Sequence, residues 1–357
     1  LSVGEPDFPT PFHVRQAAID AIQEGKTFYT PSRGLMSMRK EIANVMARKY
    51  QLTYDPATEI IVTFGASEAL EATFITLLNP GDEVILVTPV YVTYEPILIM
   101  AGATIVHVPT DHTTGFKLTP EALRHAITDK TKLVVLNYPN NPTGGIMTRQ
   151  DYEGIAEVLR ETDAYIVSDE IYSELIYDAH HASIAQFEDL KARTVVINGF
   201  SKAYAMTGWR LGYLCANAEL VNAIGKYHSN AILCPPTISQ FAGIEALKNG
   251  DDDIKHMREE YDIRRRYVVD RLNKMGLPCA IPQGAFYAFP SIEATGMDSL
   301  TFCQQLLEKK RVAVIPGIAF GAAGDRYIRF SYSYSIKHIE EALDRIEDFM
   351  RELSTKV

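Results

Sequence analysis

The chain has 357 residues, a mass of 39.9 kDa and a net charge of −10 at pH 7. This acidic balance disfavours nucleic acid as a partner, because phosphate backbones bind clustered basic groups, and no apolar run is long enough for a membrane span. The four cysteines are scattered without the paired spacing of a metal site, which predicts reduced thiols, a cytoplasmic enzyme and no metal.

Short β-branched runs alternate with helical stretches over most of the chain. The predicted strands are residues 59–64, 83–87, 104–108, 133–137, 165–168, 194–198 and 211–215, and predicted helices between them include 67–78, 120–127 and 149–161. Continuous apolar strands separated by helices are typical of a parallel sheet that is covered on both faces. We therefore expect an α/β fold with a mainly parallel seven-stranded sheet.

The pattern changes after Gly250. A long charged helix is predicted over 252–275, followed by the segment 284–289, a helix over 300–309, a strand over 327–331 and an amphipathic helix from Ile336. This order predicts a smaller α+β domain of residues 261–357 together with 1–9, beside a large domain of residues 10–260. The basic run 264–266 lies within the charged helix, where we expect it to form a solvated face.

Three early segments carry candidate cofactor ligands. Ala66 and Ser67 follow a predicted strand and open a helix, so backbone N–H groups and the helix dipole can attract a phosphate there. Ser67 is equally suited to be a plain N-cap. Tyr91 follows another strand and can stack on a cofactor ring or simply fill the core. Asn141 lies in a Pro-Gly loop at a strand end, which is either a ring-binding loop or an ordinary turn.

An acidic pair, Asp169 and Glu170, directly follows the strand at 165–168. A carboxylate at such a strand end can pair with a protonated pyridine nitrogen and keep the ring electron-withdrawing. Glu170 is the rival acid, and Asp169 can instead cap the following segment. Tyr172, three residues beyond Asp169, can hydrogen-bond a phenolic oxygen on the same ring.

The most informative segment places Lys202 beside Ser201 and eight positions before Arg210. A lysine that attacks a carbonyl must lose its proton, which desolvation or a neighbouring cation promotes. Serine and arginine are the side chains that a phosphate needs, so the segment suggests pyridoxal 5'-phosphate; a surface lysine beside a turn is the alternative. Arg329 alternates with apolar residues of a predicted strand and can hold an α-carboxylate bidentately.

Taken together, these residues resemble the class I/II aminotransferases, which are pyridoxal-phosphate enzymes of fold type I. The match runs the full length, in the order V-G-E-P-D-F from Val3, Y-T-P from Tyr29, N-P-T-G from Asn141, S-D-E-I-Y from Ser168, S-K at Ser201, and Arg329. The spacing between successive residues also agrees: 28 from Asn141 to Asp169, 33 from Asp169 to Lys202, 8 from Lys202 to Arg210 and 119 from Arg210 to Arg329. Each motif alone is modest, whereas the ordered set is very specific.

The resemblance implies a role for each catalytic and ring-binding residue. Lys202 would be the Schiff-base lysine and the base for a 1,3-proton shift. Asp169 would pair with the pyridine nitrogen, while Asn141 and Tyr172 would contact the phenolic oxygen. Tyr91 would stack on the ring.

The remaining contacts divide between the phosphate and the substrate. The phosphate would be held by the Ala66 amide, Ser67, Ser201, Arg210 and, from the other subunit of a homodimer with composite sites, Tyr29. The substrate α-carboxylate would be held by Arg329, the Gly4 backbone and Asn141. Family members usually begin earlier than Leu1, with a helix that covers the active site, so we expect such a helix before Leu1 and closure of it, together with the small domain, over the substrate.

Two departures from the family pattern bear on function. Gly199 stands where some members carry a phosphate-binding serine, so one phosphate contact is expected to be absent. Ser67 stands where some dicarboxylate-preferring relatives carry a lysine, which argues against a dedicated aspartate aminotransferase.

Segments 115–119, 173–178 and 289–292 resemble N-acetyl-LL-diaminopimelate aminotransferases, and the chain is also similar to bacterial aromatic amino-acid aminotransferases. The cofactor motifs do not separate these two groups. The expected activity is transfer of an α-amino group from a small-molecule amino acid to the 2-oxo acid 2-oxoglutarate, in amino-acid metabolism or biosynthesis. Another enzyme on the same scaffold, such as a C–S lyase or a racemase, would keep the same cofactor residues.

Overall fold

The structure, a computed structural model, describes residues 1–354. All seven predicted strands form and build one sheet: β1 (Ile60–Thr63), β2 (Glu83–Thr88), β3 (Thr104–Pro109), β4 (Thr131–Asn137), β5 (Tyr165–Asp169), β6 (Thr194–Gly199) and β7 (Gly212–Cys215). Their order is β1-β7-β6-β5-β4-β2-β3, and only β7 runs against its neighbours. The predicted α/β fold with a mainly parallel seven-stranded sheet is confirmed.

Alternate residues of these strands pack into different layers, because successive side chains in a strand point to opposite faces. Val84 and Leu133 belong to the core under the helices of one face, whereas Ile85 and Val134 belong to the core of the other. The first face carries α3 (Gly65–Leu77), α4 (Tyr94–Met100) and α8 (Ala218–Ala231). The second carries α2 (Met36–Tyr50), α5 (Pro120–Ala126), α6 (Arg149–Arg160), α7 (Glu188–Lys191) and α9 (Thr237–Asn249). Burial on both faces explains the continuous apolar runs of the sequence.

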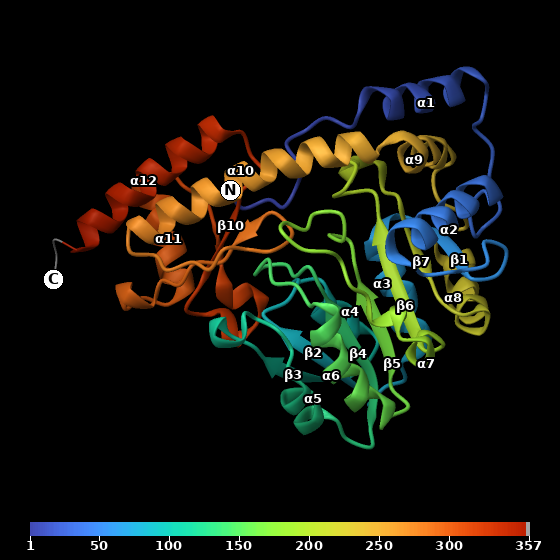
Figure 1. Cartoon of the computed structure of the whole chain (residues 1–357), viewed down its shortest axis with the longest axis horizontal. Helices are drawn as coiled ribbons and strands as arrows, with labels where there is room; N and C mark the ends of the chain where they lie inside the picture. The colour runs from blue at the N-terminus through green and yellow to red at the C-terminus, as the bar shows by residue number, and fades with distance from the viewer. Residues whose placement is uncertain (355–357) are drawn as a thin grey trace.

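A second, antiparallel sheet lies beyond Gly250, in the order β8-β10-β9. Its strands are β8 (Tyr287–Ala288), β9 (Ile315–Pro316) and β10 (Ile328–Ser331), and its helices are α10 (Asp251–Lys274), α11 (Ser299–Lys310) and α12 (Ile336–Ser354). Figure 1 shows α10 running from α9, beside the large sheet, to α12. The predicted domain boundary at 260/261 therefore falls inside one continuous helix. Over residues 1–354, no helix combines the length and apolar character needed to cross a membrane.

The prediction of a solvated face for the basic run of α10 is wrong for two of its three arginines, because Arg264 and Arg265 are buried. The Arg265 guanidinium donates to Asp178 and Asp262 and lies 4.4 Å from the centre of the Tyr177 ring. Arg264 donates to Asp7 at 2.7 Å. Both charges are buried because carboxylates from other parts of the chain pair with them.

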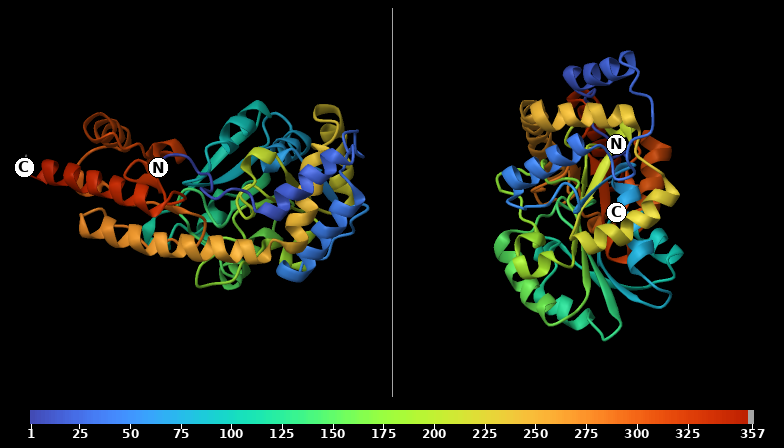
Figure 2. Two further views of the ribbon diagram at one scale, coloured as in Figure 1. Left: turned by 90° about the horizontal axis from the view of Figure 1, so that it is seen from above. Right: turned by 90° about the vertical axis from the view of Figure 1, so that its right-hand side faces the viewer.

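The segment of residues 1–10 crosses from the small sheet to the large one; we call it the strap. Its Leu1 carbonyl accepts a hydrogen bond from the Ser331 amide in β10 at 3.0 Å. At the other end, the Thr10 hydroxyl donates to the Ala205 carbonyl at 2.6 Å. Beyond the strap, α1 (Phe12–Gln23) packs against α9, and the right-hand view of Figure 2 shows α1 at the top edge of the molecule.

Candidate active site

A cavity of about 510 Å³ lies where the strap passes the carboxyl ends of the parallel strands. Eleven of the twelve site residues predicted from the sequence line it: Gly4, Ala66, Ser67, Tyr91, Asn141, Asp169, Tyr172, Ser201, Lys202, Arg210 and Arg329. The twelfth, Tyr29, lies in a separate surface groove and is 83% exposed. Topology explains much of the convergence, since the predicted residues from Ala66 to Lys202 lie at or after the ends of β1, β2, β4, β5 and β6 at one edge of the sheet. Arg210 precedes the antiparallel β7 at the same edge, whereas Gly4 comes from the strap and Arg329 from β10.

One part of the cavity wall is built for an anion. Gly65 has φ of +79°, and a Cβ at this position would meet Arg210 Nη2 at 2.6 Å. A Cβ on Gly212 would come within 2.5 Å of the Ala66 backbone nitrogen. Glycine at both positions therefore lets the Arg210 guanidinium and β7 approach the N-terminus of α3. The positive end of this helix and the arginine together favour a phosphate.

Lys202 follows β6, and its Nζ donates to the Gly4 carbonyl of the strap at 2.6 Å. Burial lowers the pKa of Lys202 to about 8; the charge of Glu5 opposes this shift, and the cations Arg329 and Arg210 add to it. About a tenth of the amine is consequently neutral at pH 7, and the neutral form predominates above pH 8. Such an amine can act as a nucleophile or as a base.

Asp169 ends β5 and directs its carboxylate into the cavity wall. Burial raises the pKa of Asp169 to about 6, although two hydrogen bonds favour the charged form. These come from the Tyr94 hydroxyl, at 2.5 Å, and from the Ile171 amide, at 3.2 Å. The group is therefore an anion at neutral pH and can accept a hydrogen bond from a protonated ring nitrogen.

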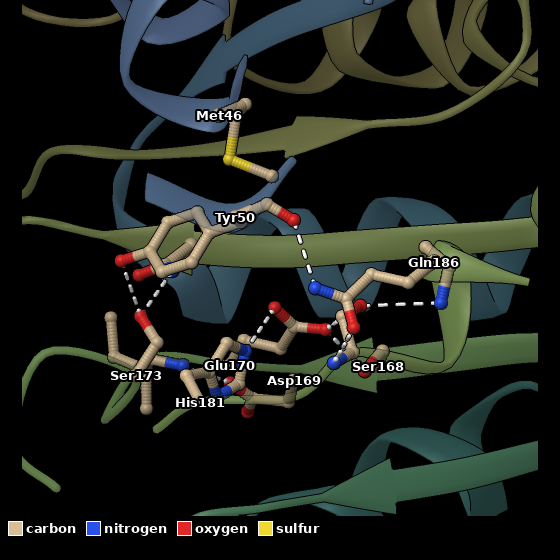
Figure 3. A network of polar contacts seen from close by, with 12 residues as sticks. Met46, Tyr50, Ser168, Asp169, Glu170, Ser173, His181 and Gln186 are labelled. Atoms are coloured by element: carbon tan, nitrogen blue, oxygen red, sulfur yellow. Dashed lines mark hydrogen bonds and ion pairs between the residues drawn. The ribbon is translucent and has the colours of Figure 1, made fainter. Parts of the chain in front are cut away.

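The rival acid, Glu170, lies on the other side of the strand end and does not line the cavity. Its carboxylate accepts hydrogen bonds from Ser168 Oγ at 2.8 Å and from Ser183 Oγ, and pairs with His181 Nε2 at 2.7 Å. Figure 3 shows Glu170, Ser168 and His181 turned toward one another. Alternation along the strand thus separates the two acids, and of the two only Asp169 lines the cavity.

Arg329 in β10 lines the cavity from the small sheet. Its Nη1 donates to Asn141 Oδ1 at 2.9 Å and its Nη2 to the Ser2 carbonyl at 2.6 Å, whereas Nε is buried without a partner. The guanidinium carbon lies 4.5 Å from the centre of the Tyr287 ring and 5.0 Å from that of Phe320. Among residues 1–354, no carboxylate pairs with this buried cation. A buried charge without a counter-ion is suited to a ligand carboxylate.

Two tyrosines of the site were missed by sequence reasoning. Tyr94 donates to Asp169, and Tyr287 shares a hydrogen bond of 2.8 Å with the Tyr172 hydroxyl. A Cβ on Gly4 would lie 1.9 Å from the Tyr287 hydroxyl oxygen, so only glycine lets the strap pass this ring. In the sequence, both tyrosines resemble ordinary core aromatics.

Comparison with known proteins gives a consistent assignment. The model of the family "Aminotransferase class I and II" matches residues 1–346. The chain is 47% identical to a probable N-acetyl-LL-diaminopimelate aminotransferase of Bacillus subtilis, over 98% of this chain and 88% of that protein. It is 42% identical to an aspartate aminotransferase of Pyrococcus abyssi, over 99% and 91%. The crystal structure of an aromatic aminotransferase from Pyrococcus horikoshii OT3 superposes with a TM-score of 0.96 at 42% identity, covering 98% of this chain and 95% of that one.

Proposed function

This chain belongs to the class I and II aminotransferases, which depend on pyridoxal phosphate, and we propose that its amino donor carries an aromatic or N-acetyl-LL-diaminopimelate-like side chain and its acceptor is 2-oxoglutarate. The observation that carries the proposed transamination of an amino acid is the pairing, in one cavity, of a half-buried amine with a lowered pKa, Lys202, and a buried guanidinium without a carboxylate partner among residues 1–354, Arg329. The first suits carbonyl and proton chemistry, and the second suits the α-carboxylate of an amino acid.

The residues of the cavity fit pyridoxal phosphate. The approach of Arg210 to the start of α3 across Gly65 leaves an anion cradle for the phosphate, with Ser67, Ser201 and the Ala66 amide beside it. Asp169 would hold a proton on the pyridine nitrogen. When bound, the cofactor supplies an aldehyde carbon and an electron-withdrawing ring.

Each residue then has a physical task in the reaction. Arg329 and Asn141 orient the α-carboxylate, which brings the α-hydrogen toward Lys202. The Lys202 amine removes the proton from Cα and later delivers it to the carbon that accepts the amino group. Tyr172 and Tyr287, joined by their hydroxyls, close one wall and keep water from the reacting atoms.

The charges of the cavity bear on the donor. Its basic lining residues are Lys202, Arg210 and Arg329, and each has a task other than side-chain recognition. A lining acid, Glu5, would repel a short acidic side chain. The rest of the lining includes the apolar side chains Val3, Leu70, Val92, Ile315 and Phe320. We therefore favour a neutral donor such as tyrosine or phenylalanine over aspartate, while the distant carboxylate of N-acetyl-LL-diaminopimelate can bind outside the cavity.

A half-reaction screen tests this proposal. The holoenzyme is mixed with tyrosine, phenylalanine, N-acetyl-LL-diaminopimelate or aspartate, without a keto acid, and conversion of the cofactor to pyridoxamine phosphate is followed by absorbance. We expect the favoured donor to exceed aspartate in kcat/KM by about tenfold or more, which corresponds to about 1.4 kcal/mol of differential transition-state binding. Fastest reaction with aspartate would support the alternative, an aspartate aminotransferase. Release of a thiol, a 2-oxo acid and ammonia from an added thioether amino acid such as cystathionine would instead indicate a C–S lyase.

We also propose that the enzyme is a cytoplasmic homodimer with composite sites. Phe28 and Tyr29 are more than four-fifths exposed, in a groove that also includes Phe64, and such exposed aromatics are typical of an interface. Tyr29 is free to reach a partner's phosphate. Two-fold symmetry would place two equivalent contacts in one interface. The cysteines of residues 1–354 are free thiols, in keeping with a reducing compartment.

Subunit mixing tests the composite site. Lys202→Ala and Tyr29→Phe homodimers are dissociated, mixed and reassociated. Each heterodimer should contain one site with both substitutions and one unmodified site, so activity should rise above the sum of the parents. Sedimentation checks the assembly. An active monomer, or no gain on mixing of proven heterodimers, would contradict the proposal.

A further inference from the structure

His228 in α8 is fully buried between two parts of the cofactor site that are distant in sequence. Its Nδ1 lies 3.0 Å from Glu68 Oε1, and its Nε2 lies 2.6 Å from the Ser32 carbonyl oxygen. Helix α8 packs against α3, which carries Glu68 in its first turn (Figure 1). The imidazole therefore connects the start of α3 to the loop that precedes α2.

Both ring nitrogens face oxygen acceptors. A carbonyl oxygen can only accept, so Nε2 carries a proton, and a carboxylate facing Nδ1 calls for a second one. Burial lowers the pKa of His228, but the hydrogen bond and charge of Glu68, helped by the Ser32 carbonyl, outweigh both burial and the repulsion of Arg33 and raise it. The geometry thus describes an imidazolium paired with a carboxylate.

The two partners of His228 belong to phosphate-binding segments. Glu68 directly follows Ser67, and its second oxygen accepts a hydrogen bond from the Phe64 amide at 3.1 Å, which fixes the turn around Gly65. Ser32 lies three residues after Tyr29, in the loop of residues 28–34. The same loop is held at Phe28 by the Thr237 hydroxyl, at 2.7 Å.

We propose that His228 is a positioning residue of the cofactor phosphate site, with two effects. First, as an imidazolium it neutralises Glu68 beside the phosphate. Second, through Ser32 it fixes the loop that carries Tyr29 toward the partner's phosphate. The second half rests on the proposed homodimer. The first half follows from electrostatics within one subunit. A buried carboxylate one residue from Ser67 would repel a phosphate dianion, and the paired imidazolium removes this repulsion.

The proposal can be tested by removing the charge of His228, the charge of Glu68, or both. If His228 compensates the charge of Glu68, removing both charges should be less harmful than removing His228 alone, which a purely structural role would not predict. The variants are His228→Gln, Glu68→Gln and the double substitution, each prepared as full-length enzyme. The probes are pyridoxal phosphate and pyridoxal, which lacks the phosphate, and the readout is the dissociation constant of each from absorbance titrations. Thermal melting reports on the fold.

We expect His228→Gln to weaken pyridoxal phosphate binding about tenfold, as for loss of one charge-assisted hydrogen bond, and to leave pyridoxal binding unchanged. The double variant should recover most of the loss, because no unpaired carboxylate remains. Equal losses for both probes, or no recovery in the double variant, would overturn the proposal. If the wild type itself bound no pyridoxal phosphate, the proposed function would fail instead.

The link to Tyr29 is tested by a double-mutant cycle. If His228 acts partly by holding the loop, the loss caused by His228→Gln should be at least about threefold smaller in a Tyr29→Phe background than in the wild type, because coupled residues are not additive. Strict additivity in a dimer confirmed by sedimentation would overturn this half of the proposal.

Discussion

Replacing Lys202 with alanine is expected to lower the transamination rate by a factor of about 10⁴ or more, because the substitution removes both the nucleophilic amine and the proton carrier. The fold should survive, since Nζ makes one hydrogen bond within residues 1–354, to the Gly4 carbonyl, and burial of the amine is itself costly. The variant should still bind pyridoxal phosphate through the phosphate cradle, without becoming labelled on borohydride reduction. Lys255→Ala, an exposed lysine of α10, is the matched control. Near-normal turnover by Lys202→Ala would refute the assignment of this site.

The same labelling reaction in the wild type should depend on pH in a defined direction. The pKa of Lys202 is lowered to about 8, so the amine is protonated below this pH and neutral above it. Labelling of apoenzyme by pyridoxal phosphate and borohydride, quantified by mass spectrometry of the Lys202 peptide, should therefore rise with pH through about 8. A rise only above pH 10 would show an amine with its ordinary affinity for protons.

The large sheet could be predicted because its strands, except the partly exposed edge strand β3, are buried on both faces and so stand out as continuous apolar runs. Strands β8 and β9 have two residues each, which is too short for a period of alternation to appear in the sequence. The burial of Arg264 and Arg265 could not be predicted from the sequence either. Their carboxylate partners Asp7 and Asp178 lie 257 and 87 residues away along the chain, so only the tertiary structure brings these charges together.

The candidate site could be predicted because its polar residues follow strands whose carboxyl ends must meet at one edge of the sheet. The tyrosines that support these residues could not. The Tyr94 hydroxyl hydrogen-bonds Asp169, which lies 75 residues away in the sequence, and the Tyr287 hydroxyl hydrogen-bonds Tyr172, which lies 115 residues away. A tyrosine in a buried strand or helix gives no sequence signal that separates a core ring from one whose hydroxyl orients a catalytic group.

The neighbouring acids Asp169 and Glu170 offer a matched pair of substitutions with opposite expected results. Asp169→Asn should lower the half-reaction rate about 10³-fold, because an amide oxygen cannot hold the ring proton as a carboxylate does. The fold should change little, since the asparagine oxygen can keep the hydrogen bond from the Ile171 amide, now made to Oδ1. The asparagine NH₂ group can donate to the Tyr94 hydroxyl, which in the wild type donates to Oδ2. Stopped-flow absorbance with the favoured donor measures the rate.

Glu170→Gln should have the opposite effect, with a half-reaction rate within about tenfold of the wild type and a lower melting temperature. The carboxylate of Glu170 accepts hydrogen bonds from Ser168 and Ser183 and pairs with His181, away from the cavity (Figure 3). An amide NH₂ group would face donors there, which costs about 1–3 kcal/mol for a buried unsatisfied group. If the glutamine variant lost as much rate as Asp169→Asn, the side of the strand on which the ring nitrogen binds would have to be reassigned. The two acids are adjacent in sequence, and the alternation of one strand decides which of them lines the cavity.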